Sequence, residues 1–77
     1  MSDEPLRMIT IYHHAKDYPQ FNFVARQWFI VAGKVWTTPE LFAKGDTLRE
    51  VRKSIPPWMV CMAPAVEDDP VIVETWI

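Results

Sequence analysis

The chain has 77 residues and a formal net charge of -2, which indicates one domain and gives no global attraction to nucleic acid or an anionic membrane. A hydrophobic fraction of 49% excludes a disordered chain. Cys61 is the only cysteine, so no intrachain disulfide can form.

Two extended segments open the chain after residues 1–5, which we expect to be frayed. Residues 6–13 are rich in β-branched and aromatic side chains, which predicts a strand. Residues 21–32 first alternate between apolar and polar side chains and then become continuously apolar. This pattern predicts a second strand whose second half is buried on both faces, with a bend or bulge near Gln27.

A turn and a third strand follow. Gly33 and Lys34 predict the turn because glycine tolerates a positive φ, and residues 35–37 predict the strand. Residues 38–45 suit either a helix that starts at Thr38 and is capped by Gly45 or a strand end followed by a loop. We favour the loop or a single helical turn.

The strongest local signal is a helix start. Thr47 and Glu50 fit a capping box, in which each residue's side chain satisfies a backbone N–H of the helix start. Apolar residues at helical spacing follow, and Pro56 and Pro57 end the pattern. We therefore expect a helix over residues 47–55, too short to be stable unless it packs on a sheet.

The last third of the chain predicts extended structure again. Residues 58–62 suit a short strand or extended segment, residues 63–70 a loop and residues 71–77 a final strand. The expected fold is α+β, with a small antiparallel sheet of three to four strands and one short helix packed on one face. The order is β-β-β-α-β, with an extra short strand after the helix as an alternative. One domain spans residues 1–77.

No catalytic, metal or cofactor site is predicted, and we do not expect an enzyme. His13 and His14 would point to opposite faces of a strand, so a pH-responsive contact suits them better than a shared zinc site. Cys61 lies in an apolar run, which predicts a buried, inert thiol. Two glycines are too few for a phosphate-binding loop.

Surplus apolar strand surface indicates a binding function. A nine-residue helix covers at most one face of a sheet, whereas two of the predicted strands carry apolar side chains on both faces. We therefore predict a protein-interaction or regulatory module, as a homodimer, with residues 71–77 available for pairing if they form an edge strand. The candidate protein-binding residues are Trp28, Trp36, Trp76, Ile77, Glu67, Asp68 and Asp69.

Two alternatives remain open. The first is a nucleic-acid-binding or antitoxin-like regulator that uses a basic stretch. The second is an inhibitor of a host complex, encoded by a phage or mobile element, that acts through the acidic residues 67–69. The candidate nucleic-acid-binding residues are Lys44, Arg49, Arg52 and Lys53.

Residues 39–41 (Pro-Glu-Leu) followed by residues 45–51 (Gly-Asp-Thr-Leu-Arg-Glu-Val) resemble the strand-to-helix junction of HicB-type antitoxins. The resemblance covers about 13 residues and implies a small α+β domain that pairs with an RNA-cleaving toxin. The spacing between Leu41 and Gly45 is short for that family, and the family's downstream DNA-binding segment is missing.

The expected compartment is the cytoplasm of a bacterial or phage-infected cell. The acidic start of the chain lacks the basic and apolar regions of a signal peptide. Its longest strongly apolar run falls far short of the roughly 20 residues that span a bilayer, so no membrane contact is expected.

Overall fold

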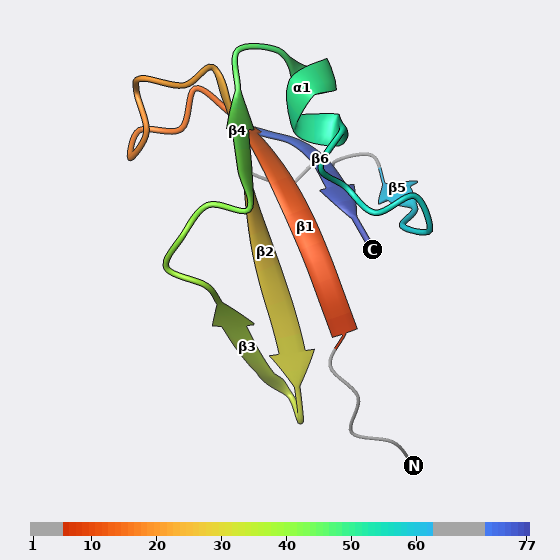
Figure 1. Ribbon diagram of the computed structural model, residues 1–77. Helices are drawn as coiled ribbons and strands as arrows, with labels where there is room; N and C mark the ends of the chain where they lie inside the picture. Colours follow the sequence, from red (N-terminus) through yellow and green to blue (C-terminus); the bar gives the residue numbers. More distant parts are fainter. Residues whose placement is uncertain (1–5, 63–70) are drawn as a thin grey trace.

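The computed structural model describes residues 6–62 and 71–77 (Figure 1). One antiparallel sheet carries the described strands in the order β3-β2-β1-β6-β5, and β4 also pairs with β2. Among these residues, no helix has the length and apolar character needed to cross a membrane. The elements are β1 (Leu6–His13), β2 (Phe23–Val31), β3 (Lys34–Thr37), β4 (Ala43–Gly45), α1 (Leu48–Arg52), β5 (Cys61–Met62) and β6 (Ile72–Trp76).

The expected sheet of three to four strands is wrong, because the described sheet has six. The main error is β4, which forms where a loop or helical turn was expected and which includes Gly45. Its three residues have little strand propensity, but β2 offers them an unpaired edge. Directly before β4, the Phe42 N–H donates to the carbonyl of Ala25 in β2 at 2.8 Å, which holds the start of β4 against β2.

The first hairpins follow the sequence pattern closely. β1 has the expected bounds, and β2 lies within the expected residues 21–32. The turn is one residue earlier than predicted: Val31 pairs with Lys34, so Ala32 and Gly33 form a two-residue loop. Both have positive φ, 51° and 79°, the signature of a type I′ turn.

The expected irregularity in β2 is absent. Gln27 pairs with Ile9 in an unbroken register along β1. The register shift lies instead between β1 and β6, at Ile11 and Tyr12.

The helix begins where the capping box predicts and is shorter than expected. Thr47 is the N-cap, and its hydroxyl accepts from the Glu50 N–H at 3.2 Å. The Glu50 carboxylate accepts from the N–H of Asp46 at 2.9 Å, one residue before the N-cap. Past Arg52 the chain continues in turns, because Ile55 N–H donates to the Arg52 carbonyl at 3.0 Å.

The core lies between α1 and one end of the sheet. Paired residues in an antiparallel sheet share a face, so Ile9, Ile11 and Ala25 all belong to the face that α1 covers, here called the helix face. Val51 of α1 packs against them and is fully buried. The opposite side is here called the second face.

The apolar second half of β2 is not buried on both faces as predicted. Its buried residues are Val24 and Ala25 in the first half, whereas residues 26–31 are all partly exposed. The reason is the position of α1, which lies beside β4 at one end of the sheet, while the β2–β3 hairpin lies at the other (Figure 1).

Candidate functional site

The hairpin end of the sheet exposes apolar side chains on both faces. All four residues of β3 are exposed, and Val35 and Trp36 are 61% and 59% accessible. Trp36 pairs with Phe29 on the helix face, and Val35 pairs with Ile30 on the second face. The apolar run of β2 therefore continues onto an exposed edge strand.

The outer edge of β3 carries main-chain groups that no other described strand pairs with. In a two-residue hairpin the pair that flanks the turn, here Val31 and Lys34, exchanges hydrogen bonds. Because bonded and non-bonded pairs alternate, the N–H and C=O groups of Val35 and Thr37 point away from β2. This edge offers two outward pairs of donor and acceptor, one on each side of Trp36.

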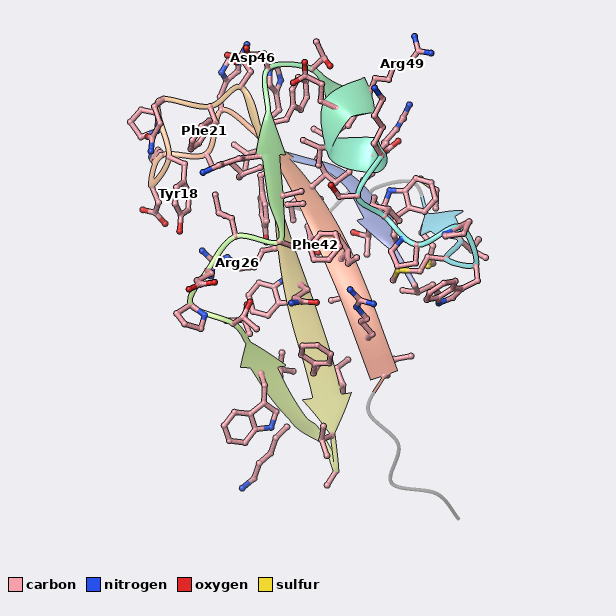
Figure 2. The ribbon with its side chains drawn as sticks, in the orientation of Figure 1. Tyr18, Phe21, Arg26, Phe42, Asp46 and Arg49 are labelled. Atoms are coloured by element: carbon pink, nitrogen blue, oxygen red, sulfur yellow. The ribbon has the colours of Figure 1, made fainter. Side chains whose placement is uncertain are left out.

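A hollow of about 680 Å³, partly open to solvent, lies over the second face near β2. Arg26 lines this hollow. Its guanidinium donates to the Thr38 carbonyl at 3.2 Å and to the Tyr18 hydroxyl at 3.3 Å. These bonds join β2 to the segment after β3 and to the β1–β2 loop. Figure 2 shows Tyr18 and Arg26 on the same side of the molecule. The lining residues are Tyr12, Ala15, Lys16, Asp17, Tyr18, Val24, Arg26, Trp28, Leu41 and Val71.

Sequence reasoning missed most of this hollow. Only Trp28 among its lining residues was a candidate. The one available signal was Arg26, a charged residue that lies between Val24 and Trp28 on one face of a predicted strand. Tyr18 and Leu41 lie in loops, and nothing local indicates that they meet Arg26.

Trp76 and Ile77, the candidates at the end of the chain, already have partners within the protein. β6 lies between β1 and β5 and is not an edge strand. Ile77 and Val60 exchange main-chain bonds at 2.7 and 3.0 Å. Trp76 packs against the core, and its indole N–H donates to the Glu74 carboxylate at 3.1 Å. Residues 71–77 were expected to pair with another chain only if they formed an edge strand. Because β6 has a neighbour on each side, that pairing is not available.

A second exposed apolar group surrounds β5. Trp58, Val60 and Met62 are 76%, 63% and 48% accessible. Met62 leads directly into residues outside the described ranges, so the surroundings of this group are not described. The acidic candidates Glu67, Asp68 and Asp69 also lie outside the described residues.

The basic candidates lie on β4, on α1 and at the end of α1. Lys44 lies over the ring of Phe21, 5.0 Å from its centroid, and Arg49 points away from the sheet (Figure 2). Arg52 is paired with Glu74, and Lys53 is exposed after the helix. The charge of Arg52 is thus balanced within the protein.

The Arg52–Glu74 pair shifts the titration of its neighbours. Hydrogen bonding from Arg52 holds the pKa of the Glu74 carboxyl below its ordinary value, against the opposing effect of burial. Cys61 is exposed, which contradicts the expected buried thiol. Partial burial of its sulfur, followed by the charge of Glu74, raises the pKa of the Cys61 thiol, so the thiol form is favoured.

The two histidines do not point to opposite faces. β1 ends at His13, and His14 takes a φ of 58°, which turns its ring onto that of His13 with centroids 3.7 Å apart. His13 in turn stacks on Phe23 at 4.4 Å. Within the described part of the chain, no group of three or more His, Cys, Asp or Glu residues could hold a metal ion.

Comparison with known proteins found no matching family model, no matching curated protein and no matching solved structure.

Proposed function

We propose that this chain is a non-enzymatic interaction module that forms a homodimer by pairing the β3 edges of two copies. The observation that carries the proposal is the exposed edge strand with its outward main-chain groups and the accessible Trp36. Exposed edges of this kind recruit another strand by main-chain hydrogen bonding.

A second copy fits this edge because the edge is self-complementary. If a two-fold axis passes between the two copies of Trp36, Val35 of each copy lies opposite Thr37 of the other. Both residues present outward donors and acceptors, so the two pairs would exchange four main-chain bonds. The facing indole rings would form a cross-strand aromatic pair, which contributes roughly 0.2–1 kcal/mol beyond main-chain bonding.

Charge also favours a second copy over an acidic or basic partner. Val35, Trp36 and Thr37 are uncharged, and Lys34 is the single charge on β3. In the register centred on Trp36 the two Lys34 side chains lie at opposite ends of the paired segment, where both remain in solvent. The net charge of -2 per chain gives only weak repulsion between copies.

The test is the solution mass of the wild type and two matched variants, measured by light scattering after size-exclusion chromatography. Wild type should show twice the chain mass of 9.0 kDa. Trp36→Glu places two carboxylates opposite each other and should give the mass of one chain. Trp58→Glu changes a more exposed tryptophan just before β5, which is the opposite end of the strand order from β3. This variant should stay dimeric.

Mixing two charged variants tests directly whether the two copies meet at Trp36. Trp36→Glu mixed with Trp36→Lys should restore the dimer, because opposite charges then face each other across the axis. A wild type of one chain mass at every concentration would overturn the homodimer. A Trp36→Glu variant that stays dimeric would overturn the β3 edge as its surface.

The nucleic-acid alternative would depend mainly on Lys44, Arg49 and Lys53, because Arg52 is paired with Glu74. The inhibitor alternative depends on residues 67–69, which lie outside the described ranges.

A further inference from the structure

Two hydrogen bonds hold the Arg26 guanidinium in place at the hollow. The guanidinium carries five N–H groups, and two of them donate to Thr38 and Tyr18. These two bonds come from different terminal nitrogens and fix the plane of the group. Among the described residues no further acceptor engages it, so its remaining donors are available to a ligand. A fixed guanidinium binds a planar two-oxygen group with little further loss of entropy.

The charges around Arg26 favour a ligand with a single negative charge. Lys16 and Arg26 are the cationic residues of the lining, and Asp17 is the anionic one. The described residues of the lining thus have a net charge of +1. A monoanionic carboxylate balances it, whereas a phosphate dianion would be repelled by Asp17.

The walls of the hollow favour an aromatic body. Tyr12 of β1, Trp28 of β2 and Tyr18 of the β1–β2 loop supply aromatic surface, and Leu41 and Val71 supply aliphatic surface. The volume of about 680 Å³ lies inside the range of small-molecule sites. Apolar walls with one oriented polar group are the usual composition of such sites.

We propose that this hollow binds a small aromatic carboxylate, with the carboxylate on the Arg26 guanidinium and the ring against Trp28 and the two tyrosines. The proposal is independent of the homodimer. Pairing at the outer edge of β3 leaves the second face over β1 and β2 uncovered, so either proposal can fail without the other.

The test is a titration of 2-naphthoate into the ¹⁵N-labelled full chain, followed by NMR. The largest amide shifts should be those of the residues that line the hollow, namely 12, 15–18, 24, 26, 28, 41 and 71. Arg26→Gln should weaken binding about tenfold or more, because charge-assisted hydrogen bonds are lost. Tyr18→Phe keeps the ring and removes the hydroxyl that accepts a hydrogen bond from the guanidinium. We expect a smaller loss of affinity than for Arg26→Gln.

Matched controls separate binding from folding. Arg49→Gln changes an exposed arginine far from the hollow and should leave the affinity unchanged. Naphthyl phosphate should bind more weakly than 2-naphthoate, and 2-naphthol should bind more weakly still, because it lacks the carboxylate. If Arg26→Gln has a dispersed, native-like spectrum and binds 2-naphthoate as tightly as wild type, the proposal is overturned. The absence of localised shifts in wild type would overturn it as well.

Discussion

Arg52 of α1 and Glu74 of β6 form an ion pair that ties the helix to the sheet. The Arg52 Nε donates to Glu74 Oε1 at 3.0 Å, and a terminal nitrogen donates to Oε2. Trp76 donates to the same Oε1 at 3.1 Å. The Glu74 side chain is only 11% accessible, whereas the Arg52 side chain is 48% accessible. The charge of the buried Glu74 carboxylate is therefore balanced by a guanidinium that is half exposed to solvent.

Replacement of the cation should destabilise the fold. Arg52→Met keeps the aliphatic stem and leaves the Glu74 carboxylate, among the described side chains, with the neutral donors Trp76 and Cys61. We expect a loss of about 1–2 kcal/mol, in the lower range for charged hydrogen bonds because Arg52 is half exposed. Urea denaturation measures it, with Arg49→Met as the matched control on the same helix. Equal stability of the two variants would contradict a structural role for the pair.

The same pair predicts a pH dependence. Hydrogen bonding from Arg52 lowers the pKa of Glu74 from its ordinary value of 4.5, so the folded state binds that proton less readily than the unfolded state. Its stabilisation is present above pH 4.5 and is lost as the pH falls through the folded pKa. The difference in unfolding free energy between wild type and Glu74→Gln should be larger at neutral pH than in acid. A difference that grows in acid would contradict this sign.

Elements with strong local signals were predictable from the sequence. β1 has its expected bounds, and the helix starts at the Thr47 cap because the capping hydrogen bonds are local. β4 was not predictable, because Ala43 and Lys44 join the sheet through the free edge of β2 rather than through their own propensity. A pattern read along the chain does not show which strand edges are left open.

Exposure was harder to predict than secondary structure. The apolar residues 28–31 have the pattern of a doubly buried strand, but the placement of a five-residue helix leaves them partly exposed. Trp36 is accessible, but the sequence pattern did not distinguish exposed from buried tryptophans, and the hollow around Arg26 depends on loops that meet only in the fold. Most of the candidate site was therefore outside the reach of periodicity and propensity.

Gly45 is required by a close approach to the helix cap. A Cβ at this position would lie 2.7 Å from Glu50 Oε2 and 2.9 Å from Glu50 Cβ. Gly45→Ala should displace the Glu50 side chain from the Asp46 N–H and cost about 1 kcal/mol. In a Glu50→Ala background the clash with the oxygen is gone, so the substitution should cost less. Thermal denaturation of wild type, the two single variants and the double variant measures the coupling between Gly45 and Glu50. If the effects of the two substitutions simply add, the proposed contact is contradicted.

The β2–β3 turn offers a stabilising substitution. Ala32 has a φ of 51° and precedes Gly33 with a φ of 79°, and a left-handed conformation is costly for alanine by about 1–2 kcal/mol. Asn-Gly is the preferred pair in a type I′ turn, so Ala32→Asn should raise the unfolding free energy by up to about 1 kcal/mol. Ala32→Val should lower it, because a β-branched side chain tolerates positive φ least. Chemical denaturation of the three proteins ranks them, and a valine variant as stable as the asparagine variant would show that the turn is not left-handed in solution.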